Sequence, residues 1–109
     1  MKRYFFIFVI VVLAIGDILS QETPNLIPYR KGKKWGFCDR NKNIIIPIVY
    51  DDASPFSEGL ASVRKNNKYG FINSKGDTII PFKYDYAYSF QDGLAKVLIN
   101  SKFGFINKI

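Results

Sequence analysis

The side chains with the greatest catalytic potential in this chain are the carboxylates Asp51, Asp52, Glu58 and Asp85. A pair of carboxylates about 5–5.5 Å apart can act as nucleophile and acid in glycoside hydrolysis. The chain contains no histidine, so the commonest general base and the commonest transition-metal ligand are missing. We expect Asp51 and Asp85 to accept backbone N–H groups at a strand-to-turn corner instead. The sequence therefore predicts no catalytic, metal or cofactor site, with a carboxylate-dependent hydrolase as the remote alternative.

A cluster of cations directly precedes the only tryptophan and is the best candidate for a binding site. Its members are Arg30, Lys31, Lys33, Lys34 and Trp35. Cations beside an aromatic ring are typical of grooves that bind single-stranded nucleic acid. The same group suits an anionic component of the cell envelope, and it also fits an ordinary solvated hairpin tip. The only cysteine, Cys38, has no partner for a disulfide and is expected to be a small core residue.

The start of the chain favours export. A basic beginning is followed by an unbroken apolar run at 4–15, which matches a secretory signal. The run is short for a membrane span, which needs about 20 apolar residues. We expect residues 1–20 to form a signal peptide that is cleaved after Ser20, with Gly16 as the alternative. Cleavage would leave no stable membrane span and would place the protein in the periplasm, on the cell surface or outside the cell.

Export also decides which partners a basic protein can meet. The formal charge is +7 for the whole chain. Without residues 1–20 it is +6, from 14 basic and 8 acidic side chains. An exported basic protein meets anionic envelope polymers or lipid head groups before it meets nucleic acid. We therefore expect no nucleic-acid partner, although this charge also serves ordinary solubility.

These side chains are positioned by a repeat with a period of 34 residues. Between 36–69 and 70–103, 15 of 34 positions are identical without a gap. The same period occurs in helical repeats, but Pro47 and Pro81 lie in mid-repeat, where each would cost a helix about 3 kcal/mol. Short β-branched runs bounded by glycine and asparagine indicate strands instead. The chain is therefore a β-repeat protein.

Each repeat is expected to contain a hairpin with a two-residue loop and a connecting third strand. This gives eight strands in an all-β, antiparallel meander of about 34-residue, three-stranded repeats, coiled as a short solenoid or a partial propeller. The turn before the third strand has Gly76 in the second repeat and Lys42 in the first, where Asn41 or Asn43 could relieve the strain. The expected parts are a short tail at 21–25 and a repeat domain at 26–109, with hairpins at 26–39, 60–73 and 94–107 and connecting strands at 44–50 and 78–84.

The two-residue loop fixes which residues face each other. It sets Arg64 opposite Tyr69 and Ser62 opposite Phe71, and alternation then gives each hairpin one aromatic and one small apolar face. We expect rings at equivalent positions to stack into a core ladder, a glycine beside them to admit a neighbouring backbone or ring, and Arg30–Trp35 and Arg64–Tyr69 to form cation–π pairs. The repeat-structural residues are Trp35, Gly36, Phe37, Tyr69, Gly70, Phe71, Phe103, Gly104, Phe105, Pro47, Pro81, Tyr50 and Tyr84.

These repeated residues resemble the WG-repeat family, also called KWG-repeat. The resemblance rests on Lys34-Trp35-Gly36-Phe37, Ile45-Ile46-Pro47, Tyr50-Asp51, Phe56, Gly59-Leu60-Ala61 and Val63, and covers about 26–109. The departures are Tyr69 and Phe103 in place of tryptophan, and Lys42 in place of a turn glycine. The ring position therefore does not require an indole.

The resemblance implies a non-catalytic module of a mostly bacterial, often exported family, with no established activity and no catalytic residues. The function expected is an exported module that binds or scaffolds an unknown protein or an anionic envelope component. The alternative is a self-associating structural fragment of a longer repeat array, because open repeat ends expose strand edges.

Overall fold

The computed structural model describes residues 25–109, and all of its regular structure is antiparallel β-strand. The predicted signal peptide lies outside the described residues, as does the predicted tail apart from Asn25. Within 25–109 no helix is long and apolar enough to cross a membrane. The strands are β1 (Ile27–Lys31), β2 (Lys34–Cys38), β3 (Ile44–Tyr50), β4 (Asp52–Ala53), β5 (Ala61–Lys65), β6 (Lys68–Ile72), β7 (Thr78–Tyr84), β8 (Tyr86–Ala87), β9 (Ala95–Ile99) and β10 (Lys102–Ile106).

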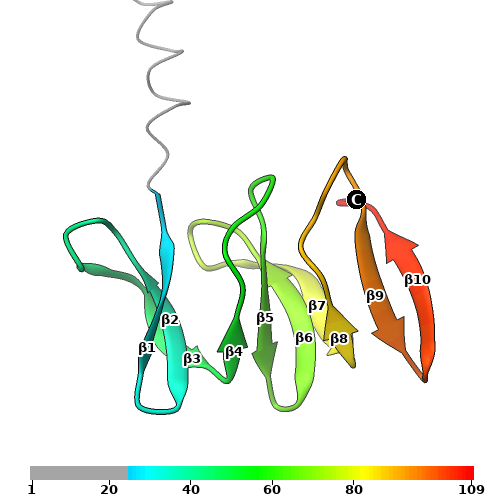
Figure 1. The fold of residues 1–109 in the computed structure, drawn as a ribbon, viewed down its shortest axis with the longest axis horizontal. Coiled ribbons are helices and arrows are strands. Elements are labelled where there is room, and N and C mark those ends of the chain that lie inside the picture. The colour runs from blue at the N-terminus through cyan, green and yellow to red at the C-terminus, as the bar shows by residue number, and fades with distance from the viewer. Residues whose placement is uncertain (1–24) are drawn as a thin grey trace, which may run out of the picture.

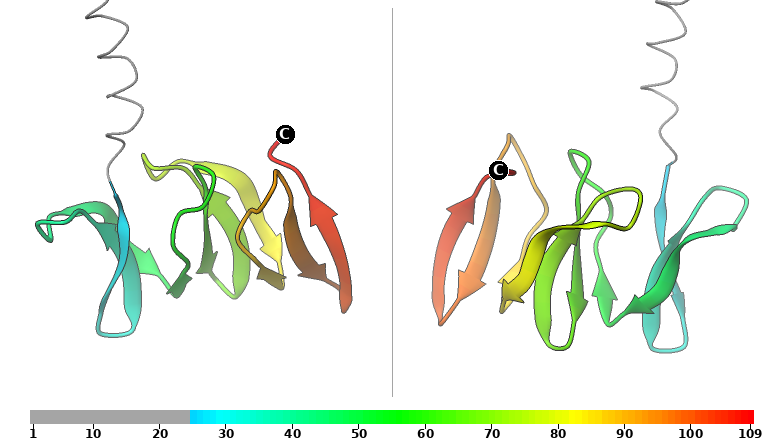
Figure 2. Two further views of the ribbon diagram at one scale, coloured as in Figure 1. Left: turned by 45° about the horizontal axis from the view of Figure 1, so that its top comes forward. Right: turned by 180° about the vertical axis from the view of Figure 1, so that it is seen from behind.

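The strands form three sheets that lie side by side in a row (Figures 1 and 2). Their strand orders are β1-β2-β3, β4-β5-β6-β7 and β10-β9-β8. Each sheet is built on one hairpin, and β3 and β7 pair with the second strand of the hairpin before them. The expectation of eight strands was wrong, because β4 and β8 add one short strand each. Two residues are too few to show an alternating pattern in the sequence, and these strands form because the chain turns back along the next hairpin.

The two-residue loop between β5 and β6 has the backbone that its asparagines predict. Asn66 and Asn67 both have positive φ, 54° and 67°. Two such residues in succession match the twist of the flanking strands. The predicted register is observed, with Arg64 opposite Tyr69 and Ser62 opposite Phe71.

The turn between β2 and β3 carries a lysine where the second repeat has a glycine. Lys42 itself adopts φ 64°, whereas Gly76 takes φ 86° at the equivalent place. Lys42 therefore occupies the strained place, as expected, and the alternative that Asn41 or Asn43 takes it does not occur. The Asp39 carboxylate accepts the backbone N–H groups of Asn41 and Asn43 at 2.8 and 2.9 Å, which holds the turn in this shape.

The core lies between successive hairpins. The aromatic face of one hairpin packs on the small apolar face of the next. The first cluster joins Phe37, Ile46 and Tyr50 to Ala61, Val63 and Ile72, and the second joins Tyr69, Phe71, Ile80 and Tyr84 to Ala87, Phe90, Ala95 and Val97.

The predicted ladder of stacked rings is not formed within residues 25–109. Phe37 packs against Phe56 with ring centroids 4.9 Å apart, and Phe71 against Phe90 at the same distance. Each ring therefore meets the phenylalanine of the segment that leads into the next hairpin, not its own counterpart. The small face of the next hairpin separates the counterparts, so successive rings cannot touch.

The glycine beside the ring admits a neighbouring backbone, as predicted, in two of three hairpins. A Cβ at Gly36 would lie 2.5 Å from the Ile46 carbonyl oxygen, and one at Gly70 would lie 2.6 Å from that of Ile80. The pairing of β2 with β3 and of β6 with β7 shifts register at these glycines. At Gly104 no described residue would lie within 4 Å of the added Cβ, so the close approach seen at Gly70 has no equivalent in the described part of the third hairpin.

The third hairpin also leaves its rings uncovered. Phe103 is 58% exposed and Phe105 is 67% exposed, whereas Phe37 and Phe71 are fully buried. The prediction that Phe103 and Phe105 are core residues was therefore wrong. Among the described residues, no connecting strand and no further hairpin pack on this aromatic face.

Candidate functional site: a basic edge of hairpin tips

The three hairpin loops project to the same edge of the molecule, at the bottom of Figure 1, while the turns that lead into β3 and β7 lie at the opposite edge. This follows from the repeat, because every hairpin starts at the same edge of the molecule and its first strand runs in the same direction. The cations of the three loops are thereby gathered in one row, which we call the basic edge. It comprises Arg30, Lys31, Lys33, Lys34, Arg64, Lys65, Lys68 and Lys102.

The positive charge of the basic edge is densest at the first tip, which contains the binding residues predicted from the sequence. Arg30, Lys31, Lys33 and Lys34 are all exposed, and Trp35 is half-buried. Lys31 and Lys33 make no ion pair within residues 25–109, and neither do Lys65 and Lys102 on the later tips. Binding of an anion to these unpaired lysines would not require an existing ion pair to break.

Two lysines of the basic edge are paired with carboxylates. Lys34 Nζ lies 2.5 Å from Asp51 Oδ1, and Lys68 Nζ lies 2.6 Å from Asp85 Oδ1. The Lys34 hydrogen bond lowers the pKa of Asp51. The pKa of Asp85 is lowered by Lys68 and then by the backbone N–H of Asn100. Both carboxylates therefore stay ionised at neutral pH and reduce the net charge of the edge.

These ion pairs were not predicted, although the sequence contains a signal for them. The lysine before the ring and the aspartate after the connecting strand both recur at the 34-residue period, 17 residues apart. Asp85 meets the expectation of backbone acceptance, because it accepts the N–H of Asn100 at 3.0 Å. Asp51 meets it too, since a backbone hydrogen bond from Asn66 helps to lower its pKa, although the Lys34 side chain is its principal partner.

The arginines of the first two tips behave differently. The Arg30 guanidinium lies over the Trp35 ring, 5.8 Å from its centroid, as predicted. The Arg64–Tyr69 cation–π pair was predicted as well, but it is not formed in the described part of the chain. The Arg64 guanidinium instead donates to the Asp51 carbonyl oxygen at 3.5 Å. The carbonyl at the end of β3 draws it away from the ring.

A hollow of about 280 Å³ opens beside the second tip. It is lined by Lys65, Asn66, Lys68 and Phe82. Of its two lysines, Lys65 has no ion pair within residues 25–109, whereas Lys68 is held by Asp85.

The four candidate carboxylates each have a separate partner. Asp52 accepts a hydrogen bond from the Tyr69 hydroxyl at 2.7 Å. Burial, together with this bond, raises the pKa of Tyr69 to about 12. Asp51 and Asp85 are held by lysines at the basic edge, as described above.

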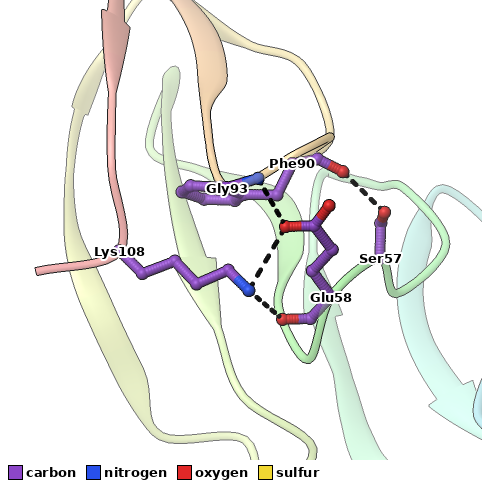
Figure 3. A network of polar contacts seen from close by, with 5 residues as sticks. All are labelled: Ser57, Glu58, Phe90, Gly93 and Lys108. Atoms are coloured by element: carbon purple, nitrogen blue, oxygen red, sulfur yellow. Dashed lines mark hydrogen bonds and ion pairs between the residues drawn. The ribbon is translucent and has the colours of Figure 1, made fainter.

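Glu58 lies at the opposite edge, where it joins the turns of two successive repeats (Figure 3). It accepts the backbone N–H of Gly93 at 3.0 Å, and its carboxylate lies 3.3 Å from Lys108 Nζ. Beside it, the Ser57 hydroxyl donates to the Phe90 carbonyl oxygen at 2.6 Å. Glu58 therefore acts as a clamp between units and is remote from the other three carboxylates.

The remaining candidate for chemistry is the cysteine. Cys38 is buried with 4% of its surface exposed, in the place that Ile72 takes in the next hairpin. This agrees with the prediction of a small core residue. Among residues 25–109 no three histidine, cysteine or acidic side chains are grouped as metal ligands.

Comparison with known proteins gives one match. A family model described as a WG containing repeat matches residues 35–69 and 69–103. Each matched segment runs from the ring of one hairpin to the ring of the next, so it contains one inter-unit interface. No curated protein and no solved structure matches the chain.

Proposed function

The chain belongs to the WG-repeat family, and on this premise we propose that it is an exported, non-catalytic binding module. In this proposal the module is a short solenoid that holds an anionic envelope polymer along its basic edge. The observation that carries the proposal is the row of three hairpin tips on one edge (Figure 1), together with the lysines and arginines that the sequence places at these tips. Successive tips present charge at regular intervals, which suits a partner whose own charges repeat.

The absence of catalysis in this proposal is supported by the separate engagement of the carboxylates. Glu58 is fixed between two turns at the far edge, and Asp52 is bonded to Tyr69. A pair of carboxylates that shares one substrate needs both groups free and close together. The partners of these side chains favour structural roles for all of them.

Binding is tested with long-chain polyphosphate as a defined polyanion. The variant Lys31→Ala/Lys33→Ala removes two unpaired charges at the first tip. Its matched control, Lys42→Gly/Lys75→Ala, removes two exposed lysines from the opposite edge and gives the same net charge. We expect the affinity for polyphosphate to fall as the salt concentration rises. In Lys31→Ala/Lys33→Ala the magnitude of the slope of log K against log salt should be smaller by about 0.7 for each phosphate that the protein no longer neutralises.

Equal affinities of the two variants would refute the basic edge as the binding surface. Binding that does not change with salt would exclude the ionic mechanism. Export is tested separately, by cell fractionation and N-terminal sequencing of the accumulated protein. We expect Gln21 as the first residue, and retention in the cytoplasm would refute export without affecting the polyanion assay.

A further inference from the structure

The outer edge of β10 lacks the strand that both earlier hairpins have. β3 pairs with β2 and β7 pairs with β6, but in the described part of the third sheet β10 is an edge strand with β9 as its only neighbour. Backbone N–H and C=O groups along an edge strand are free to pair with an extended segment. Three further features show that this edge retains the shape and chemistry of an acceptor.

The first feature is the space at Gly104. At Gly36 and Gly70 the missing Cβ makes room for the backbone of β3 and β7, at 2.5 and 2.6 Å from an ideal Cβ position. Gly104 occupies the same place in β10, and no described residue would lie within 4 Å of a Cβ there. The third hairpin thus has the gap that a crossing strand requires, and no described strand fills it.

The second feature is Lys102. Its equivalents Lys34 and Lys68 each bind the aspartate that follows the connecting strand. Lys102 has no ion pair in the described part of the chain. A strand docked on β10 in the same register would bring an acidic residue to this lysine.

The third feature is a cavity of about 450 Å³ between β7 and the residues of and after β10. Its walls include Ile80, Pro81, Phe105 and Ile106. One repeat earlier, the turn that leads into β7 packs on β3, and a Cβ at Gly76 would lie 3.7 Å from the Ile46 side chain. Ile80 is the counterpart of Ile46, so the cavity lies where the turn before a third connecting strand would pack.

We propose that β10 is an acceptor for an extended strand of a partner polypeptide, which pairs antiparallel to it as β3 pairs with β2. The chemistry of the occupant follows from the pattern that β3 and β7 share. In both strands two isoleucines and a proline are followed by two variable residues and a tyrosine, and an aspartate comes directly after the strand. By the observed register, its tyrosine lies opposite Phe103 and its second isoleucine opposite Phe105. Its aspartate reaches Lys102.

This mode of recognition gives affinity through main-chain hydrogen bonds and specificity through alternate side chains. Phe103 and Phe105 are 58% and 67% exposed and would be partly covered by the incoming isoleucine and tyrosine. The strand site shares Lys102 with the basic edge, but Gly104→Ala and the variant of the first hairpin tip test the two sites separately.

The test uses the full chain, purified in the form in which it accumulates, and a fluorescent peptide with the sequence of residues 73–85. We expect saturable binding by anisotropy, and slower amide exchange in residues 102–106 when the peptide is present. Gly104→Ala fills the gap with a methyl group and should weaken binding at least about tenfold. Because no described residue lies near that position in the free protein, the variant should fold as the wild type does, which thermal unfolding checks.

A charge exchange tests the register. Lys102→Glu should weaken the peptide, and a peptide with lysine in place of its last aspartate should restore part of the affinity. A scrambled peptide of the same composition is the control for non-specific apolar binding. Absence of saturable binding, or equal binding by Gly104→Ala, would overturn the proposal. Protection of 102–106 by self-association in the absence of peptide would overturn it too, in favour of a second copy of the chain as the occupant.

Discussion

Replacing Gly70 by alanine should destabilise the protein, whereas the same change at Gly104 should stabilise it. A Cβ at Gly70 would lie 2.6 Å from the Ile80 carbonyl oxygen and 3.0 Å from the Phe82 backbone nitrogen. Both neighbours are backbone atoms of β7, so they can yield only if the strand moves. Such overpacking costs about 1–3 kcal/mol, and we expect a value of about 2–3 kcal/mol because no flexible side chain absorbs the contact.

Part of this cost is offset by the lower chain entropy of alanine, which is worth about 0.5–1 kcal/mol in a strand. The net cost of Gly70→Ala is then about 1–2.5 kcal/mol, taken as the difference of those two terms. At Gly104 only the favourable term remains, because no described residue would lie within 4 Å of the new methyl group. The entropy term is common to both variants, so the difference between them isolates the steric cost.

The assay is thermal and urea unfolding of the two variants beside the wild type. A domain of this size changes by about 4–8 °C in Tm for each kcal/mol. Gly70→Ala should therefore melt about 4–20 °C lower, and Gly104→Ala about 2–8 °C higher. Equal effects of the two substitutions would refute the assignment of Gly70 as the crossing point of β7. Gly36→Ala provides a second measurement, because its Cβ would lie 2.5 Å from the Ile46 carbonyl oxygen.

Four further substitutions probe the interfaces and the titrating groups. Phe71→Ala should cost about 3–5 kcal/mol because the ring is fully buried, while Phe105→Ala, at the equivalent but exposed place, should change the urea-derived free energy of unfolding by less than about 0.5 kcal/mol. The pKa of Tyr69 is raised from 10.0 to about 12, so its neutral hydroxyl stabilises the fold below pH 10, and this contribution is lost as pH rises toward 12. In an absorbance titration at about 295 nm, Tyr69→Phe should therefore lack the tyrosine ionisation step at the highest pH. Retention of that step would contradict its assignment to Tyr69. The pKa of Asp85 is lowered from 3.8, so its contribution is present above that pH and is lost as pH falls below it; Asp85→Asn should flatten the acid limb of the stability curve, and an unchanged limb would contradict a role for the Lys68 pair.

The local structure of each repeat could be predicted from the sequence because its signals are local. The asparagine pair at 66–67 fixes the hairpin loop, and the loop fixes the register. The positions of Pro47 and Pro81 exclude helix, and β3 and β7 span the stretches predicted for them. Period-2 alternation then assigns Tyr69 and Phe71 to one face.

The relation between repeats could not be predicted in the same way. Alternation shows that a hairpin has two faces, but it does not show that one face meets the other face of the next hairpin. The prediction of a ladder of stacked rings was therefore wrong, and so was the prediction that Phe103 and Phe105 are buried. Burial depends on what lies next to a face, which periodicity alone does not contain. For the same reason the sequence does not predict that Lys65 and Lys102 lie in one row with the first tip, because only the path of the chain through space brings the three tips to one edge.

The interface between hairpins joins two unlike faces, and this gives the molecule a direction. A unit cannot be turned around in the row, because its aromatic face would meet another aromatic face. A tandem duplication of 34 residues would therefore insert in only one orientation, and it would add one interface and one hairpin tip without disturbing the rest. Stability and the number of charged tips should then both rise by one increment per copy. Gene duplication can in this way lengthen the molecule in steps of one repeat, and selection can then favour the length that matches the partner.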